Sequence, residues 1–220
     1  MGRYRILLAF GFAAPLLATA CALNAPAPPP MARPAAFIPL GLGASYLGAD
    51  VIGGRKARAA KMRAAKIRPL SSDVGSYMAR AERELRAQTA GIGVDILPIG
   101  DSSILIRVPA ALTFNSNSAD VRPQFAGTLT ELARTLKQYN QAYVDVFAHT
   151  DTSGTPQANL ALSQKRASAV ATFLGSRGVT RARIASKGLG ETAPLYPDDQ
   201  SEDQRAANRR VEIRLVPYRG

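Results

Sequence analysis

The chain has little of the chemistry that most metal proteins and many enzymes need. Its 220 residues include one cysteine, one histidine and no tryptophan. A single cysteine excludes an internal disulfide framework and any metal site built from several cysteines. A single histidine excludes the zinc centres that use two or three imidazoles. We therefore expect no metal and no cofactor.

Long apolar runs are also lacking. No stretch reaches the roughly 18 apolar residues of a mature transmembrane helix. With 46% hydrophobic residues, the chain is still long enough to bury a core of ordinary size. Its net charge of +12 favours anionic partners such as nucleic acid, acidic lipid or cell-wall polymer. The excess is uneven, because residues 21–68 carry eight basic residues and one acidic residue.

Residues 1–20 have the layout of a signal peptide. Two arginines precede an apolar stretch over residues 6–18, and small residues lead up to Cys21. A cysteine in this place resembles a bacterial lipobox, which implies that Cys21 is acylated and becomes the first residue of the mature protein. An ordinary signal peptide with an incidental cysteine is the alternative. Ala22 stands where an inner-membrane retention signal would have Asp, which implies sorting to the outer membrane.

Residues 21–68 are interpreted as a linker followed by a basic segment. Six prolines between residues 26 and 39 favour an extended spacer. The glycines of residues 41–54 indicate either a flexible tether or close packing of helices. The run over 55–68 is a helix candidate that ends by Pro69, and it is either simply solvated, bound to acidic lipid or bound to nucleic acid. The last partner is not expected, since no aromatic residues are interleaved. The basic residues are Arg55, Lys56, Arg58, Lys61, Arg63, Lys66 and Arg68.

The rest of the chain alternates between strand and helix patterns. Apolar residues spaced three and four apart predict helices, and alternating ones predict strands. The expected helices cover about 74–88, 125–139 and 155–177. The expected strands cover 94–99, 103–108, 143–149, 183–187 and 209–216. This order predicts an α/β protein in the broad sense, a two-layer α+β fold with helices packed on a mixed β-sheet.

Five motifs then point to a known family. They are Thr113-Phe114, the run from His149 to Gly154, Asn159 with Leu162-Ser163 and Arg166-Ala167, Gly188 to Glu191, and Asn208 to Ile213. In this order they resemble the OmpA C-terminal domain family, which includes the Pal and MotB periplasmic domains. The resemblance covers residues 103–217 and implies an OmpA-like domain over 103–220. A helix and the first hairpin strand (69–102) precede that domain. With the lipobox and the glycine-rich stretch, these segments resemble the YiaD-type outer-membrane lipoproteins.

The resemblance implies non-covalent binding of peptidoglycan through the diaminopimelate of its stem peptide. The free end of diaminopimelate bears an ammonium and a carboxylate. Asp151 resembles the family aspartate that holds the ammonium, and the planar guanidinium of Arg166 suits the carboxylate. Asn159, Ser163 and Arg166 fall at i, i+4 and i+7 and therefore share one helix face. A structural salt bridge between Asp151 and Arg166 is the alternative interpretation.

Further site residues are also implied by the resemblance. Thr113, Phe114 and Asn115 resemble the segment that lines the family's pocket. One of Arg209 and Arg210 is expected to contact the ligand, and the strand alternation does not decide between them. His149 has no second histidine or cysteine nucleophile as a partner. We therefore expect it to have a structural, hydrogen-bonded role.

Together these features predict a tether that has no enzyme activity. Acylated Cys21 would sit in outer-membrane lipid, and the domain would face the periplasm and bind peptidoglycan. The acidic residues between 198 and 203 are interpreted as a solvated loop rather than as catalytic carboxylates. A wall-anchoring subunit of a larger secretion or motor-like envelope complex is the alternative function. A chaperone-like role in outer-membrane assembly is a further alternative, and other envelope proteins are possible partners.

Overall fold

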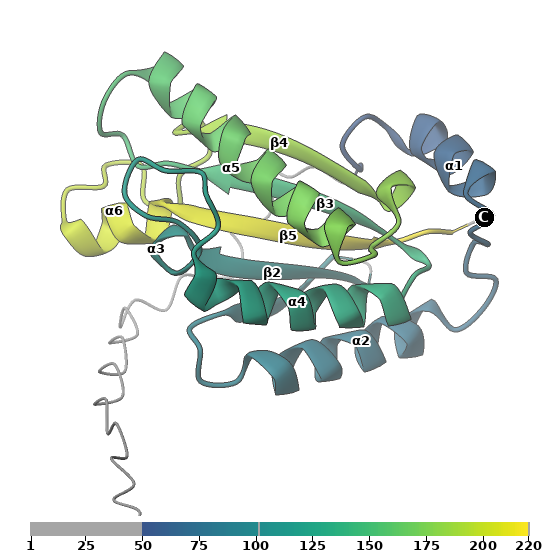
Figure 1. Cartoon of the computed structure of the whole chain (residues 1–220). Helices are drawn as coiled ribbons and strands as arrows, with labels where there is room; N and C mark the ends of the chain where they lie inside the picture. Colours follow the sequence, from purple (N-terminus) through teal and green to yellow (C-terminus); the bar gives the residue numbers. More distant parts are fainter. Residues whose placement is uncertain (1–49, 101, 220) are drawn as a thin grey trace, which may run out of the picture. The chain divides into compact units, whose positions relative to one another are not determined.

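The computed structural model describes residues 50–100 and 102–219 (Figure 1). The expected signal peptide, Cys21 and the proline-rich spacer lie outside the described residues. A five-stranded sheet has the order β1-β2-β5-β3-β4. Its strands are β1 (Asp95–Ile99), β2 (Ser103–Pro109), β3 (Ala142–His149), β4 (Ile184–Gly190) and β5 (Arg210–Pro217). The expected mixed sheet is confirmed.

The connections follow the sequence patterns closely. β1 and β2 form the expected antiparallel hairpin, and β5 lies antiparallel between β2 and β3. β3 and β4 are parallel, so the chain crosses between them through a helix, α5 (Pro156–Ser176). The side chain of Thr155 caps this helix by accepting from the backbone of Ala158, and Pro156 occupies its first turn. These two features are the ones from which the sequence predicts the start of the helix.

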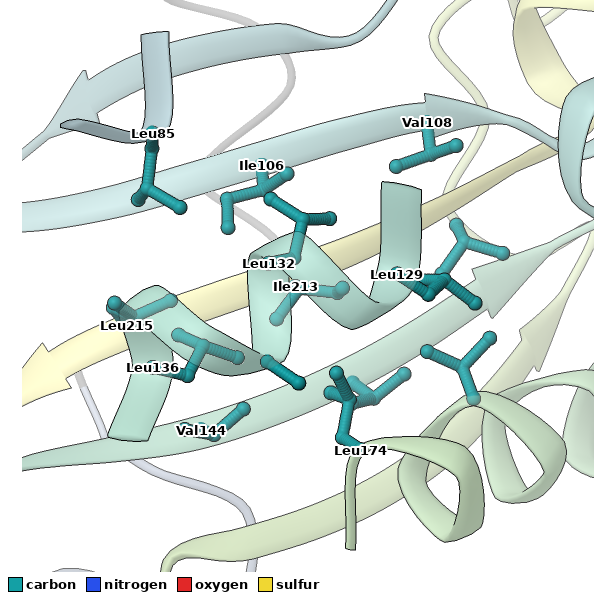
Figure 2. Packing of buried hydrophobic residues seen from close by; sticks show 14 of the residues in the cluster. Leu85, Ile106, Val108, Leu129, Leu132, Leu136, Val144, Leu174, Ile213 and Leu215 are labelled. Carbon is teal, nitrogen blue, oxygen red and sulfur yellow. The ribbon is translucent and has the colours of Figure 1, made fainter. Parts of the chain in front are cut away.

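Three helices cover one face of the sheet and enclose the main core (Figure 1, Figure 2). They are α2 (Val74–Thr89), α4 (Pro123–Gln138) and α5. Leu85 of α2, Leu132 of α4 and Leu174 of α5 are fully buried against alternate residues of the strands. Figure 2 shows Ile106, Val144 and Ile213 pointing toward these leucines from the sheet. Burial of this apolar surface holds the helices on the sheet.

The opposite face of the sheet is also buried, but it is charged. Helix α1 (Arg55–Ala64) lies against the beginning of β3, where Met62 packs with Tyr143, Val216 and Tyr218. Arg58 reaches the fully buried carboxylate of Asp145 at 2.9 Å. The basic segment therefore contains a helix that packs on the domain, an arrangement that none of the three alternatives drawn from the sequence includes.

Three short elements complete the structure. They are α3 (Ala110–Thr113), the 3-10 turn η2 (Arg181–Arg183) and α6 (Glu202–Asn208), none of which is among the expected elements. In the part of the chain that the structure describes, no helix combines the length and the apolar character needed to cross a membrane.

Candidate ligand-binding site

Three segments meet at one end of the sheet because of its register. In the antiparallel pair of β3 and β5, Ala148 lies opposite Val211, so the residues that follow β3 pass those that precede β5. β2 ends at the same edge, because Pro109 pairs with Arg210. The loop after β3, the segment after β2 and the start of β5 are therefore neighbours although they are distant in the sequence.

A pocket of about 540 Å³ opens where these segments meet. Its walls come from α3 and the loop that follows it, from the loop after β3, from α5 and from the region of α6. The lining residues are Ala110, Ala111, Phe114, Asn115, Ser116, Asn117, Arg122, Thr150, Asp151, Ser153, Asn159, Leu162, Arg166, Glu202 and Arg209. Among the described residues, no group of three or more His, Cys, Asp or Glu side chains is placed to hold a metal ion.

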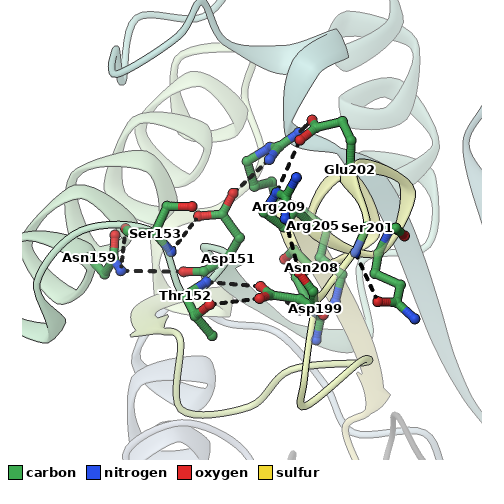
Figure 3. A network of polar contacts seen from close by, with 12 residues as sticks. Asp151, Thr152, Ser153, Asn159, Asp199, Ser201, Glu202, Arg205, Asn208 and Arg209 are labelled. Carbon is green, nitrogen blue, oxygen red and sulfur yellow. Dashed lines mark hydrogen bonds and ion pairs between the residues drawn. The ribbon is translucent and has the colours of Figure 1, made fainter.

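Asp151 is the central anion of this pocket (Figure 3). Its side chain is nearly buried, with a residue exposure of 7%. One carboxylate oxygen accepts from the backbone N–H of Ser153 at 3.1 Å. The side-chain amide of Asn159 donates to the carbonyl oxygens of Asp151 and Ser153 and to the carboxylate of Glu191. Asn159 thereby ties the loop to α5 and fixes the carboxylate of Asp151 in the pocket.

A second carboxylate, that of Asp199, also holds the loop after β3. Asp199 accepts from the backbone N–H of Thr152 at 3.0 Å and from its hydroxyl at 2.6 Å. The side-chain amide of Asn208 donates to Asp199 as well, at 3.2 Å. Burial acts to raise the pKa of Asp199, but these hydrogen bonds outweigh it and lower the pKa below its ordinary value. Asp199 is therefore a buried structural carboxylate, and its interpretation as part of a solvated loop is wrong.

Arg166 is a buried cation without an ion pair in the part of the chain that the structure describes. Its residue exposure is 5%, its Nε donates to the carbonyl oxygen of Ser118 at 2.9 Å, and its guanidinium lies 5.2 Å from the centre of the Phe114 ring. Within residues 50–100 and 102–219, no ion pair joins Arg166 to a carboxylate. Burial, and then the nearby charge of Arg209, lower its pKa, and the charge of Asp151 offsets only part of this effect. A carboxylate placed beside Arg166 would relieve this unfavourable electrostatic environment.

Arg209 bridges two carboxylates at the mouth of the pocket. Its Nη1 donates to Asp151 at 2.6 Å, and its Nη2 donates to Glu202 of α6. Burial acts to lower the pKa of Arg209, but its hydrogen bonds to Asp151 and Glu202 raise it. The same contact, together with Arg205, lowers the pKa of Glu202. A direct salt bridge between Asp151 and Arg166, the alternative interpretation of these two residues, is absent among the described contacts, and Arg209 pairs with Asp151 instead.

The structure brings six of the expected site residues together around the pocket. They are Phe114, Asn115, Asp151, Asn159, Arg166 and Arg209. As expected, Asn159, Ser163 and Arg166 share one buried face of α5.

Three expected residues lie outside the pocket lining. The Thr113 hydroxyl donates to the carbonyl oxygen of Pro109. The Ser163 hydroxyl donates to the carbonyl oxygen of Leu160 and accepts from the backbone N–H of Gly190. Arg210 is buried on the far face of the sheet, where it pairs with Glu212 at 2.8 Å. These three side chains support the site and do not face the pocket.

Glu202 and Arg122 are pocket residues that the sequence patterns do not indicate. Glu202 begins α6, which has a capping box: Ser201 accepts from the backbone of Gln204, whose side chain binds back to the backbone of Ser201. The spacing Ser-x-x-Gln is a sequence signal for such a helix start. That signal is therefore sufficient to predict α6, although not the contact between Glu202 and Arg209.

The fold and the pocket define a small α+β domain whose site holds the carboxylates of Asp151 and Glu202 and the buried guanidinium of Arg166. Comparison with known proteins identifies the family: the chain belongs to the OmpA family, whose model matches residues 113–209. The expected family resemblance is thus confirmed.

Two curated relatives and one solved structure illustrate the similarity. The chain is 41% identical over 148 residues to the probable lipoprotein YiaD of Escherichia coli K12, covering 67% of each chain. It is 37% identical over 102 residues to the peptidoglycan-binding protein ArfA of Mycobacterium tuberculosis, covering 46% of this chain and 31% of that one. The cell wall anchor of the T6SS from Pseudomonas aeruginosa superposes with a TM-score of 0.52 at 29% identity, covering 66% of this chain and 97% of that one.

Proposed function

We propose that this protein binds peptidoglycan non-covalently through the diaminopimelate of the stem peptide. The single observation that carries the proposal is the buried guanidinium of Arg166, which lines the same pocket as Asp151 and forms no ion pair with any carboxylate of the described residues. The free end of diaminopimelate carries the complementary pair of groups, an ammonium and a carboxylate. The name of the relative ArfA, a peptidoglycan-binding protein, supports the same ligand.

The proposed contacts assign one role to each charged group. Arg166 binds the ligand carboxylate through its terminal nitrogens while its Nε stays on Ser118. Asp151 binds the ammonium. In the structure, Arg209 contacts Asp151 and also has Glu202 as a second carboxylate, so it can shift toward Glu202 when the ammonium arrives. Each charge-assisted bond contributes about 1.5–3 kcal/mol, and the cost of ordering the ligand leaves a modest affinity. Modest affinity suits reversible attachment to a polymer with many sites.

We further propose that Cys21 is acylated and that the protein tethers the outer membrane to the wall, with the domain in the periplasm. The lipobox-like sequence before Cys21 supports this location. So does the name of the relative YiaD, a probable lipoprotein. In this role the protein binds its ligand without chemical turnover.

The test is a pull-down with purified peptidoglycan sacculi, using a protein of residues 22–220, which lacks the lipidation site. We expect the parent to bind, and Asp151→Asn and Arg166→Gln each to weaken binding by about tenfold or more, as expected for loss of one charge-assisted bond. Arg134→Gln is the matched control, because Arg134 pairs with Glu131 on the exposed side of α4. Folding of each variant is checked by circular dichroism.

Free diaminopimelate and lysine blocked at its α-amino and α-carboxyl groups serve as competitors in the same assay. The blocked lysine keeps its side-chain ammonium but has no free carboxylate, so only diaminopimelate should displace the protein. Equal binding by the parent and both pocket variants would contradict the proposal. Equal competition by the blocked lysine would contradict the assigned role of Arg166.

A wall-anchoring subunit of a larger envelope complex is the second candidate function. The similarity to the T6SS wall anchor over 97% of that chain favours it. Co-purification of the full chain in mild detergent separates the two functions. A free-standing tether should elute without stoichiometric partners, and a complex subunit should elute with them.

A further inference from the structure

The basic segment presents cations that are not neutralised within the domain. Lys56, Lys61 and Arg63 of α1, with Lys66 and Arg68 just after it, are all exposed. None of these five forms an ion pair with a carboxylate among the described residues. We call them the α1 basic surface. Asp50, the acidic side chain that precedes α1, already contacts Arg55 at 3.4 Å.

The α1 basic surface is held in a fixed place by the other side of the helix. Arg58 is buried and donates to Asp145 of β3 and to the carbonyl oxygens of Ile52 and Arg183. Met62 is fully buried beside Tyr143. Because these contacts hold α1 on the sheet, the exposed cations form a preorganised surface rather than a mobile charged tail.

This surface lies at the end of the sheet that is remote from the pocket. α1 packs on Tyr143, near the beginning of β3, whereas Asp151 follows the end of the same strand. A strand rises about 3.3 Å per residue, so the length of β3 separates the two sites. Figure 1 shows α1 at the right end of the sheet and α3 and α6, which border the pocket, at the left end.

We propose that the α1 basic surface binds the anionic phospholipid headgroups of a membrane. The five cations are spread along a helix and its C-terminal turn and do not converge on a cavity, which suits a broad anionic surface better than a small ligand. Long lysine and arginine stems reach such a surface while their charges stay hydrated. The segment 55–68 contains no aromatic residue on which nucleotide bases could stack.

Lipid contact at this end directs the opposite end of the sheet, and hence the pocket, away from the membrane. Cys21, the predicted acylation site, precedes α1 in the chain, so a lipid anchor would raise the effective concentration of membrane near this surface. The orientation of the pocket toward the wall rests on the proposed function, whereas the lipid contact itself does not.

The test is co-sedimentation of residues 22–220 with vesicles. One set contains phosphatidylglycerol and phosphatidylethanolamine, and the other contains only phosphatidylcholine. The variant Lys56→Gln/Lys61→Gln/Arg63→Gln/Arg68→Gln removes four charges and keeps Arg58 and Met62. The matched control, Arg80→Gln/Arg83→Gln/Arg134→Gln/Lys165→Gln, removes four exposed charges from α2, α4 and α5. Unfolding midpoints establish that both variants are folded.

We expect the parent to sediment with the anionic vesicles only, and less so in high salt. The α1 variant should bind about tenfold more weakly or worse, because four cations near an anionic surface are lost, while the control stays within about threefold of the parent. Asp151→Asn should bind the vesicles as the parent does, so that failure of the pocket and failure of the lipid contact are distinguishable.

Four outcomes would overturn the lipid assignment. The parent could fail to bind anionic vesicles, it could bind phosphatidylcholine equally well, or the α1 variant and its control could lose binding equally. Loss of sacculus binding by the α1 variant without loss of vesicle binding would also overturn it, and would assign this surface to the wall.

Discussion

At the scale of single residues, His149 is the most unusual titratable group of the domain. It is buried in β3 with an exposure of 1%, and its ring lies 3.7 Å from the carboxylate of Glu212. Burial lowers the pKa of His149 from 6.5 to about 4; the interaction with the Glu212 carboxylate acts in the opposite direction, and the charges of Arg210 and Arg107 lower the pKa further. The imidazole is therefore neutral in the folded protein at neutral pH, consistent with a structural role.

This pKa makes the stability of the protein depend on pH. His149 takes up a proton near pH 6.5 in the unfolded chain but only near pH 4 in the folded one. The unfolded state therefore binds more protons between these values, and stability falls as the pH falls through this window. Between pH 7.5 and 5 we expect the free energy of unfolding to drop by about 2 kcal/mol. Urea unfolding at a series of pH values measures this change.

The control is His149→Gln, which removes the titrating group. Its absolute stability need not match that of the parent, because only the slope against pH is compared. Most carboxylates of an unfolded chain titrate below about pH 4.5, so they contribute little in the upper part of the window. An unchanged slope in the variant would show that His149 does not cause the pH dependence.

At the scale of elements, the packing of α5 on β4 positions the site. Gly188 of β4 lies so close to α5 that a Cβ there would stand 2.3 Å from the backbone nitrogen of Gln164 and 2.6 Å from the Ser163 hydroxyl. The backbone N–H of Gly188 donates to the side chain of Gln164 at 2.8 Å. Arg166 lies two residues further along this helix. The glycine in the motif Gly188 to Glu191 is thus required for close approach of strand and helix.

Gly188→Ala should therefore disturb both stability and binding. The added methyl group collides with backbone atoms that cannot move without displacing α5, so we expect a loss of about 2 kcal/mol or more. Binding to sacculi should weaken as well, because Arg166 moves with the helix. The measurements are urea unfolding and the pull-down assay.

Gly127→Ala provides the comparison for that substitution. Gly127 is in the exposed part of α4, and a Cβ there meets nothing within 4 Å. Alanine is the better helix former, so this variant should be as stable as the parent or up to about 1 kcal/mol more stable. If the two variants behaved alike, close contact at Gly188 would not be the cause of its effect.

The longer helices and the strands are predictable from periodicity in the sequence, whereas the short helices and the orientation of some side chains are not. The structure confirms the expected α2, α4, α5 and all five strands. These elements are predictable because each has a cap, a clear period or a turn at its ends. α6 is only seven residues long, too short for a recognisable period. Which of Arg209 and Arg210 faces the pocket depends on which face of β5 meets the core. The alternation of residues along the strand cannot decide this, because every residue of β5 is buried.

At the scale of the whole described domain, the buried charges join the N-terminal segment to the sheet. Asp145 accepts from Arg58 of α1, from Arg214 of β5 and from the backbone N–H of Ile52. Arg58 and Asp145 are 87 positions apart. A local sequence pattern cannot reveal that one arginine of a basic run is buried with a distant aspartate. For this reason the sequence alone does not distinguish a solvated basic segment from a docked helix.

Because α1 is joined to the sheet in this way, a protein of residues 70–220 should have a markedly lower free energy of unfolding than one of residues 22–220. Truncation removes Arg58 from the buried Asp145 and exposes Tyr143, Val216 and Tyr218, which Met62 otherwise covers. Breaking one partner from a buried ion pair typically costs about 3–5 kcal/mol. Arg214 still contacts Asp145 at 3.0 Å, so the lower end of that range is expected.

Urea unfolding of both proteins measures the difference in the free energy of unfolding. Arg58→Met in the longer protein should reproduce much of this difference, while Arg63→Met should not. Equal midpoints for the two lengths would mean that α1 contributes nothing to the fold, and the fixed position of the α1 basic surface would then lose its physical basis.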